Sequence, residues 1–240
     1  MKYCSFSLYG DKAKYIYGAI ENAKILRSEW PDWIPIYYVD LQVPSSVLAQ
    51  LESLNAEIRV ANETWHKNGM FWRFDAIHHF DFDHVIFRDA DSRISRREME
   101  AVDQWIDSRC TLHIMRDHPW HNAAILGGMW GASSEIRSAA IDWDSTRQYG
   151  QAHGEDQRFL REKVYPYLAS SRIVHDSFFK KESETYRFPS VRYDFEFVGE
   201  SYNEFNLHSE FERRALKEIE NAPALKRKFL DLKYSAQFRL

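Results

Sequence analysis

The chain has 240 residues with nearly balanced charge, 32 Lys+Arg against 36 Asp+Glu, and 44% of its residues are hydrophobic. This composition predicts one compact globular domain, and 9 glycines and 7 prolines are too few for a collagen-like or low-complexity chain. Tight nucleic-acid binding needs a concentrated cationic face, which a formal net charge of -4 does not favour, so we expect no nucleic-acid partner.

The chain begins with a strand, a helix and a second strand. Residues 3–9 alternate apolar and small polar side chains, which is typical of a strand, and Gly10 marks the turn that follows. Apolar side chains recur at spacings of three and four over residues 14–30, which predicts a helix that ends before Pro31. The apolar run over residues 34–39 is typical of a buried parallel strand. These elements form one βαβ unit.

The same alternation continues through the next part of the chain. A helix is predicted over residues 45–54, a strand over 57–60, a second helix over 70–80, and a strand over 84–88 that runs directly into Asp89. Alternating strands and helices favour an α/β fold, in which a mostly parallel sheet is flanked by helices on both faces.

The pattern is less regular after the strand at 84–88. The further elements expected are helices over residues 95–107 and 155–167, short strands over 112–115 and 173–174, and a glycine-containing apolar segment over 125–132. From residue 204 onward the chain reads as helical and charge-rich. We therefore expect a main domain over residues 1–200 and a C-terminal helical extension over residues 201–240 that packs on it.

Asp89 and Asp91 stand at the end of an apolar strand, where ligands of open α/β sheets bind. Two carboxylates about 4 Å apart repel each other by about 4 kcal/mol at an effective dielectric of about 20, so the pair needs compensation. A divalent cation supplies it, and hard oxygen ligands suit Mg²⁺ or Mn²⁺. The alternative is a simple turn in which Arg88 or Arg93 pairs with the two acids.

Two other polar groups could complete such a site. His175 follows another short apolar strand and could bring an imidazole to the same metal, although a lone histidine there is commonly just hydrogen-bonded. Glu155 and Asp156 open a predicted helix, whose dipole stabilises their charged form, so they could act as a base or accept a hydrogen bond from a sugar hydroxyl. A plain N-cap explains them equally well.

Mixed polar and aromatic segments give further candidates. Arg73 and Asp75 lie among aromatic residues on the predicted helix at 70–80, where they could contact a ligand or form a solvated face. Residues 115–121 concentrate a cation, an anion, imidazoles and an indole in one turn, which favours binding. A zinc site of His113 with the two histidines of this turn is a weak alternative, because no cysteine lies nearby.

Missing motifs disfavour dinucleotide oxidoreductases, P-loop NTPases, zinc proteases and α/β-hydrolases. The sequence contains no glycine-rich dinucleotide or P-loop motif, no zinc-protease motif and no nucleophile elbow. Two cysteines, Cys4 and Cys110, are too few for a disulfide framework and favour a reducing compartment. The N-terminal residues lack a signal segment, and no apolar run is long enough to span a bilayer. We therefore expect a cytoplasmic protein with at most peripheral membrane contact.

Together these motifs resemble GT-A fold nucleotide-sugar glycosyltransferases, in particular the bacterial and viral enzymes that build capsule, lipopolysaccharide O-antigen or viral glycans. The segments that carry the resemblance lie within residues 1–200 and are Arg73, residues 87–93 with the D-x-D motif, residues 113–119, residues 127–131, residues 155–157 and residues 175–176. The resemblance implies a Rossmann-like, mostly parallel sheet and a metal-dependent hexosyltransferase that acts on a UDP- or GDP-linked sugar donor and a hydroxyl of a glycan or lipid-linked acceptor.

The resemblance also implies roles for individual residues. Asp89, Asp91 and His175 would hold the Mn²⁺ or Mg²⁺ that bridges the donor diphosphate, and Asp156 with Glu155 would supply the base. A histidine ligand is typical of retaining enzymes and an acidic base of inverting ones, so the stereochemistry stays open, and the cleaner match at Asp156 favours inversion. The implied donor-binding residues are Arg73, Asp75, Arg88, Asp89, Arg116, Asp117, Gly127 and Gly128, and the implied acceptor-binding residues are His118, His121 and Trp130.

Two other functions fit parts of the sequence. A phosphatase of the haloacid dehalogenase type also places a D-x-D motif after an apolar strand, although there we expect different residues after the second aspartate than Ser92 and Arg93. A non-catalytic carbohydrate-binding protein would use aromatic faces, and 15% of this chain is aromatic. Aromatic residues are more often core residues, and a binding module has no need of a strand-end acid pair.

Overall fold

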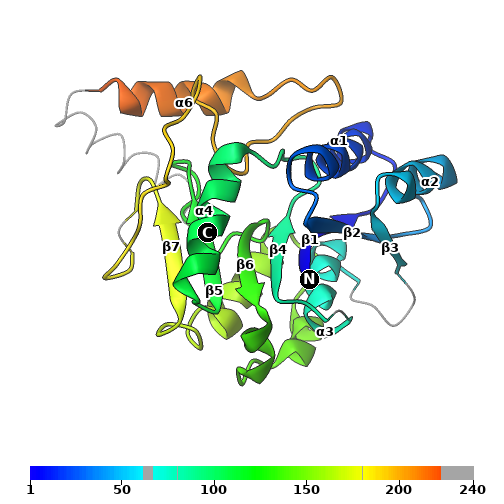
Figure 1. The fold of residues 1–240 in the computed structure, drawn as a ribbon, viewed down its shortest axis with the longest axis horizontal. Coiled ribbons are helices and arrows are strands. Elements are labelled where there is room, and N and C mark those ends of the chain that lie inside the picture. The colour runs from blue at the N-terminus through cyan, green and yellow to red at the C-terminus, as the bar shows by residue number, and fades with distance from the viewer. Residues whose placement is uncertain (62–66, 80, 180, 223–240) are drawn as a thin grey trace.

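The computed structural model describes residues 1–61, 67–79, 81–179 and 181–222 (Figure 1). Seven strands in these ranges form one sheet in the order β3-β2-β1-β4-β6-β5-β7. The strands are β1 Lys2–Leu8, β2 Trp33–Val39, β3 Glu57–Val60, β4 His84–Arg88, β5 Leu112–Arg116, β6 Met129–Ser133 and β7 Arg172–Asp176. All neighbours pair in parallel except β6, which runs antiparallel to both β4 and β5. The expected α/β fold with a mostly parallel sheet is confirmed.

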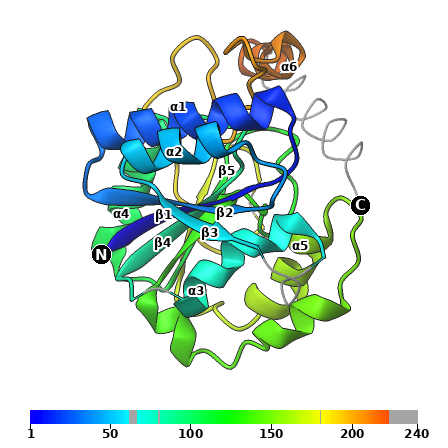
Figure 2. The ribbon, with the colours of Figure 1, turned by 90° about the vertical axis from the view of Figure 1, so that its right-hand side faces the viewer.

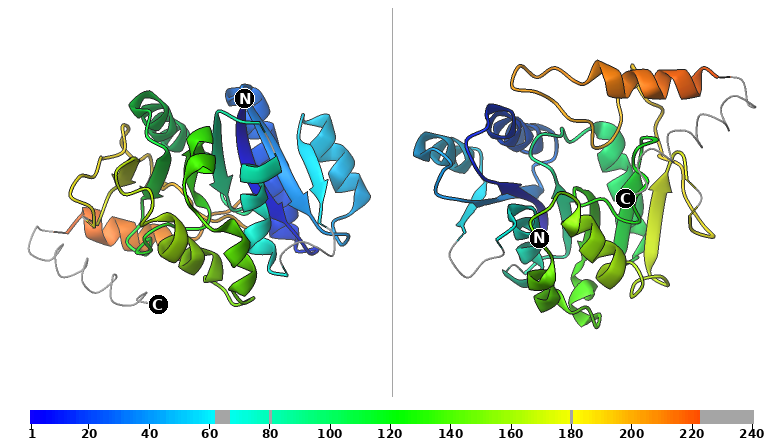
Figure 3. Two further views of the ribbon diagram at one scale, coloured as in Figure 1. Left: turned by 90° about the horizontal axis from the view of Figure 1, so that it is seen from below. Right: turned by 180° about the vertical axis from the view of Figure 1, so that it is seen from behind.

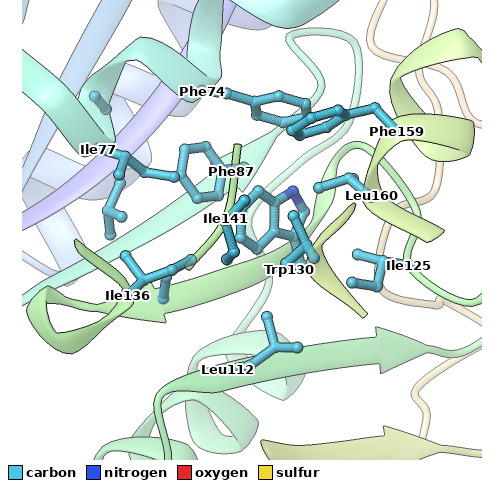
Figure 4. Packing of buried hydrophobic residues seen from close by; sticks show 14 of the residues in the cluster. Phe74, Ile77, Phe87, Leu112, Ile125, Trp130, Ile136, Ile141, Phe159 and Leu160 are labelled. Carbon is cyan, nitrogen blue, oxygen red and sulfur yellow. The ribbon is translucent and has the colours of Figure 1, made fainter. Parts of the chain in front are cut away.

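Different helices cover the two faces of the sheet (Figure 2). On one face, side chains of α1 (Ala13–Glu29), α2 (Ser45–Ser53) and α4 (Arg96–Ser108) pack on alternate strand residues such as Phe6 and Ile86. On the other face, the 3-10 helix Gly69–Asp75, α3 (Ala76–His79) and α5 (Glu155–Phe159) bury aromatic and aliphatic residues. Phe74, Phe87 and Trp130 meet at the centre of this second core (Figure 4). Burial on both faces explains why the strands read as nearly continuous apolar runs.

Three expected helices differ from the structure. The helix predicted over residues 70–80 is a 3-10 helix that continues into α3, and residue 80 lies outside the described residues. The helix predicted over 155–167 is the short α5 followed by a π-helical turn over Leu160–Val164. Of the C-terminal extension, the structure describes one helix, α6 (Glu210–Glu220), and the prediction for residues 223–240 falls outside the described part.

The C-terminal segment lies against the loop that follows β4. Helix α6 runs along the top of Figure 1, and the segment before it passes over α1 in both Figure 1 and Figure 3. The backbone of Tyr202 donates a hydrogen bond to the carbonyl oxygen of Asp91 at 2.8 Å, and Ser92 and Ser201 form a β-bridge. Among the described residues, no helix combines the length and the apolar character needed to cross a membrane.

The strand order places one position of the sheet at a topological switch point. Strand β1 has β2 on one side and β4 on the other, and both pairs are parallel. The helices that follow β1 and β4 therefore leave a crevice beyond their carboxyl ends, where ligands of open α/β sheets bind. Because Phe6 is paired with Arg88, the residues after β1 come next to Asp89.

Candidate active site

A cavity of about 420 Å³ opens beyond the carboxyl ends of β1 and β4. Its walls come from the end of β1, the first turn of α1, the 3-10 helix, the loop after β4, the loops after β5 and before α5, and the C-terminal segment. The lining residues include Tyr9, Arg73, Asp89, Asp91, His121 and Glu212. A second cavity of about 420 Å³ adjoins it, sharing Tyr9, Met70 and His153. Cavities of this size are typical of small-molecule sites.

The two aspartates of the D-x-D motif both face cations of the chain. Asp89 is the more accessible, with 54% of its side chain exposed, and it accepts a hydrogen bond from Arg73 Nη1. Asp91 is 15% exposed, and its Oδ2 accepts from Lys14 Nζ at 2.7 Å. Burial, and then the charge of Asp89, raise the pKa of Asp91 against the opposing effect of Lys14. We call Asp89, Asp91, Arg73 and Lys14 the acid-pair site.

Arg73 lies at the bottom of this site, 3% exposed. Two serines of β1 hold its backbone, because Ser5 Oγ donates to the carbonyl oxygen of Arg73 at 2.7 Å and Arg73 N donates to Ser7 Oγ at 3.0 Å. Its Nη2 donates to Asp156 Oδ2 at 2.8 Å, so one guanidinium bridges Asp89 and Asp156. Burial alone would lower the pKa of Arg73, but the two carboxylates outweigh it and raise the pKa, which keeps the group charged.

Asp156 begins α5 and is 2% exposed. One of its oxygens accepts from Arg73 and the other from the backbone of Gln157 at 2.9 Å. Burial and the charge of Asp89 raise the pKa of Asp156, although Arg73 opposes this. Glu155 points elsewhere, since its Oε2 accepts from Gly150 N at 3.0 Å. The structure therefore brings Asp156 to the acid pair and leaves Glu155 outside the cavity lining.

Two glycines form the wall behind these carboxylates. A Cβ added at Gly127 would overlap Asp156 Oδ2 and lie 2.6 Å from Arg73 Nη2, and a Cβ added at Gly128 would overlap the carboxylate of Asp89. The resemblance implied that Gly127 and Gly128 bind the donor, whereas in the structure the groups next to these glycines are side chains of this chain. Glycine is required here because any side chain would push the site apart.

The charges around the cavity sum to a net negative value. Four carboxylates, those of Asp89, Asp91, Asp156 and Glu212, stand against the two cations Arg73 and Lys14, which leaves two negative charges when all groups are ionised. A divalent cation matches this excess, and carboxylate oxygens are the ligands that Mg²⁺ and Mn²⁺ prefer. Within the described ranges, no three His, Cys, Asp or Glu side chains come close enough to form a metal site. The donor set offered here is therefore the acid pair, with positions left for water or phosphate oxygens.

Comparison with known proteins supplies an independent view of the fold. No family model and no curated protein matches the sequence. Among solved structures, glucosyl-3-phosphoglycerate synthase from Mycobacterium tuberculosis is similar with a TM-score of 0.50 and 11% identity, over 72% of this chain and 69% of that chain. The chain has a GT-A fold. At this identity the likeness establishes the fold alone.

A second solved structure with a GT-A fold is a mannosyltransferase from Pyrobaculum calidifontis in complex with GDP-Man and Mn²⁺. It matches with a TM-score of 0.48 and 12% identity over 73% of this chain. The match covers 54% of the mannosyltransferase, so this chain spans about half the length of that enzyme.

His175 does not join the acid pair, so the predicted third metal ligand is wrong. In this GT-A fold, β6 and β5 separate β7 from β4 in the sheet. The Nδ1 atom of His175 is 2.9 Å from Nε2 of His113, and its Nε2 is 3.0 Å from Oε1 of Gln104. Burial lowers the pKa of His175 to about 4, which keeps it neutral. The imidazole is a buried hydrogen-bonded group, and the weak zinc alternative with His113 finds no support among the described residues.

Asp117 does not line the cavity either and instead ties the loop after β5 to α4 and to the segment after β7. Its carboxylate is fully buried and accepts from Arg97 Nε at 2.8 Å, Arg192 Nη2 at 2.5 Å, Ser177 Oγ at 2.6 Å and the backbone of Val198 at 3.0 Å. Burial would raise the pKa of Asp117, but the two arginines outweigh it and lower the pKa. We call these residues the Asp117 cluster. Its role is structural, which corrects the expected contact of Asp117 with a donor.

Four other expected contacts are also corrected. Trp130 is fully buried, stacked on Phe87 with ring centroids 4.1 Å apart, so it cannot touch an acceptor (Figure 4). Arg88 is buried against Glu98, and Arg116 pairs with Asp176 at 3.0 Å in the interior. Asp75 ends the 3-10 helix, acts electrostatically on Tyr38 and is not among the cavity-lining residues. In the sequence these four residues suggested ligand contacts. In the structure Trp130, Arg88 and Arg116 are buried in the interior, and Asp75 lies outside the cavity lining.

The histidines of the 115–121 turn take different positions. His121 lines the cavity, and its Nδ1 accepts from the backbone of Asp117 at 3.2 Å. Burial lowers the pKa of His121 well below its ordinary value, so the ring is neutral and its proton sits on Nε2. His118 is buried, with Nε2 donating to the carbonyl oxygen of Glu212 at 3.0 Å, and it therefore holds α6 in place. His121 keeps its predicted place in the site and His118 does not.

Several cavity residues escaped the sequence analysis. Tyr9 lines the cavity and Lys14 pairs with Asp91 beside it. Both flank the turn after β1, so the rule that sites form beyond strand ends could have identified them. Ser201 and Glu212 come from the C-terminal segment, far along the chain from Asp91. No local pattern marks them, because their place depends on how that segment folds back over β4.

Proposed function

We propose that this chain is a metal-dependent glycosyltransferase that moves a sugar from a UDP- or GDP-linked donor to a hydroxyl of an acceptor, which we expect to be a glycan or glycolipid. The observation that supports this most directly is the acid pair Asp89 and Asp91 in a cavity at the switch point of a GT-A sheet. The synthase that shares the fold is solved in complex with Mn²⁺ and UDP-glucose and in complex with Mg²⁺ and UDP. The net negative charge of this cavity suits the same kind of ion.

In the proposed reaction, Asp89 and Asp91 would hold the metal, and their contacts with Arg73 and Lys14 orient the two carboxylates. A bound divalent ion would neutralise the charge that develops on the departing diphosphate. Arg73 fixes Asp89 and keeps a positive charge beneath the site, and Lys14 supplies a second cation at the cavity edge. Preorganised charges of this kind are the largest source of transition-state stabilisation in many enzymes.

The adjoining cavity offers room for the nucleoside. Tyr9 lines both cavities, and its ring meets Trp72 edge to face at 5.6 Å between centroids. Asp40 and Lys67 line the far side. An aromatic ring next to polar groups is the usual surroundings of a base and a ribose, which supports a nucleotide donor.

The structure changes the role that we assign to Asp156. A general base must come within hydrogen-bond reach of the proton that it takes. Both oxygens of Asp156 are already occupied, and the side chain is almost inaccessible. We therefore assign Asp156 to orienting Arg73, and we keep inversion of the anomeric centre as part of the proposal with the proton acceptor elsewhere in the cavity.

The two alternative functions are less well supported. The phosphatase alternative depended on the D-x-D motif alone, and the motif here lies in a GT-A fold. The carbohydrate-binding alternative depended on aromatic content, yet central aromatic residues such as Phe74, Phe87 and Trp130 belong to the core. Neither explains why three carboxylates share a site with Arg73.

Calorimetric titration with UDP- and GDP-sugars, with and without Mn²⁺, tests the proposal. We expect one donor to bind tightly with Mn²⁺, and Asp89→Asn to weaken this binding at least about 10-fold by removing a metal ligand. Asp107→Asn, which changes an exposed aspartate on α4, is the matched control and should bind as the wild type does. If no nucleotide binds under either condition, the proposed function is wrong.

A further inference from the structure

The C-terminal segment forms one wall of the cavity, and several contacts fix it to the D-x-D loop. In addition to the Tyr202 hydrogen bond to Asp91, Arg93 Nε donates to Asn206 Oδ1 at 3.1 Å, and the Arg93 guanidinium lies 4.9 Å from the ring centroid of Tyr202. The position of this wall relative to Asp91 is therefore set by contacts within the fold.

The first turn of α6 is fixed from the other side as well. Ser209 caps the helix, His118 Nε2 donates to the carbonyl oxygen of Glu212 at 3.0 Å, and Phe211 packs on Trp120 at 5.2 Å between centroids. Because Trp120 N donates to Nδ1 of His118, the proton of that imidazole must lie on Nε2. The hydrogen bond from His118 Nε2 to the carbonyl oxygen of Glu212 therefore holds the backbone from which the Glu212 side chain extends.

Glu212 lines the cavity, and the oxygens of its carboxylate are little used. Among the described residues its one side-chain hydrogen bond is with Ser201 Oγ, at 3.4 Å. Glu200 nearby is different, because both of its oxygens accept from Arg213, at 2.8 Å for Oε2. Burial, followed by the charges of Glu200 and Asp91, raises the pKa of Glu212, which makes it a better proton acceptor.

The other polar groups of the cavity are committed to different tasks. Asp89 and Asp91 are the proposed metal ligands, and Asp156 is bound to Arg73. His121 carries its proton on Nε2 and so presents a donor to the cavity. His153 lies at the exposed rim shared by the two cavities. Glu212 is left as a half-buried carboxylate that can accept a hydrogen bond from a bound hydroxyl.

We propose that Glu212 binds the acceptor hydroxyl and takes its proton during transfer, so that the C-terminal helix supplies a catalytic residue. This inference rests on the proposed function. The acceptor oxygen forms its bond to the anomeric carbon while the bond from that carbon to the diphosphate oxygen breaks. The bonding electron pair leaves with the nucleotide diphosphate, and the hydroxyl proton moves to a carboxylate oxygen of Glu212.

The test uses the full chain with Mn²⁺ and a UDP- or GDP-sugar that the wild type binds, with water as the hydroxyl acceptor. We expect Glu212→Gln to bind donor and Mn²⁺ within about twofold of the wild type in calorimetry and to release nucleotide diphosphate about 10²- to 10⁴-fold more slowly. Glu210→Gln changes a glutamate in the same helical turn whose side chain is 90% exposed, and it should keep the wild-type rate. Thermal melting checks that both variants fold.

Two further measurements distinguish a proton acceptor from a structural residue. Added formate should restore part of the rate of Glu212→Ala, because a small carboxylate can occupy the space left, and it should not restore the rate of Asp89→Ala. His153→Gln should retain more activity than Glu212→Gln. A rate for Glu212→Gln equal to that of Glu210→Gln, or loss of donor binding in Glu212→Gln, would overturn the inference alone, whereas a wild type that binds no nucleotide overturns the proposed function as well.

Discussion

Polar residues gather beyond the carboxyl ends of two pairs of strands, and the two gatherings behave differently. Beyond β1 and β4, Asp89 is 54% exposed and meets one arginine. Beyond β5 and β7, Asp117 is fully buried and accepts hydrogen bonds from two arginines, a serine and a backbone amide. Both aspartates follow apolar strands in an α/β sheet. Residue type and position at a strand end are therefore shared by a ligand site and by a structural cluster.

The two regions differ in how fully the cationic side chains of the protein balance the charge of each carboxylate. The surroundings lower the pKa of Asp117, because two arginines outweigh the effect of burial. The surroundings raise the pKa of Asp91, because burial and Asp89 outweigh one lysine. A carboxylate stabilised in its charged form by the fold has no need of a ligand, and a carboxylate left short of positive charge favours a bound cation. Strong perturbation alone does not identify a functional site.

The largest expected effect is a loss of folding stability when the Asp117 cluster is disrupted. Asp117→Asn leaves Arg97 in the interior without its counter-charge and removes one of the two carboxylates that pair with Arg192, and we expect the free energy of unfolding to fall by about 3–5 kcal/mol. Urea denaturation measures this. Asp107→Asn should change stability by less than about 0.5 kcal/mol. If Asp117→Asn were as stable as that control, the structural role of the Asp117 cluster would be wrong.

The second prediction concerns the stability cost of adding a side chain at the glycine wall behind the carboxylates. Gly127→Ala places a methyl group against Asp156 and Arg73, which are both almost fully buried, and overpacking of this kind costs about 1–3 kcal/mol. The displaced Arg73 should also weaken Mn²⁺ binding in calorimetry. The control is Gly150→Ala, where the nearest atom to an added Cβ is 3.9 Å away. Equal stability of the two variants would contradict the arrangement described here.

A third prediction concerns pH and the buried histidine pair of β5 and β7. The pKa of His175 is about 4 in the folded chain, below the ordinary value of 6.5, so the unfolded chain takes up the proton first as the pH falls. Stability contributed by this group is complete above about pH 6.5 and is lost toward pH 4. Between pH 6.5 and 5 we expect His175 to account for about 1.5 kcal/mol of the lost stability.

His175→Gln should lack that share of the acid sensitivity in urea denaturation measured at the two pH values. His78→Gln, which replaces an exposed histidine beside Trp143, controls for the removal of any histidine. Identical acid sensitivity in the wild type and in His175→Gln would show that the pair does not stay neutral in the folded state.

The smallest expected effect on stability belongs to Lys14, the more exposed of the two cations in the acid-pair site. Lys14→Met removes a partly exposed ion pair with Asp91, so the free energy of unfolding should change by less than about 1 kcal/mol. Mn²⁺ affinity without nucleotide should rise, because the metal no longer competes with the lysine for Asp91. Lys24→Met on the same helix, whose lysine pairs with Glu21, should leave Mn²⁺ affinity unchanged. Weaker Mn²⁺ binding in Lys14→Met would contradict the competition.

Much of the architecture followed from local sequence patterns. The apolar run that ends at Asp89 predicted both a buried strand and a site beyond its end, and the βαβ alternation predicted a mostly parallel sheet. These features are encoded within short segments, since periodicity, turn residues and strand ends depend on neighbours along the chain. Arg73, Asp156 and the two glycines, to which the resemblance assigned different roles, lie in contact with one another, and these contacts were not foreseen.

The tertiary structure alone decided which strand ends share a cavity. In the sequence, His175 and Asp117 lie at the ends of apolar strands, as Asp89 does. Antiparallel β6 lies between β4 and β5, however, so β5 and β7 place these two residues toward the far edge of the sheet. Glu212 reaches the cavity because the C-terminal segment folds back onto the D-x-D loop. Strand order and chain return depend on packing between distant segments, and no local pattern records which buried charges that packing will satisfy.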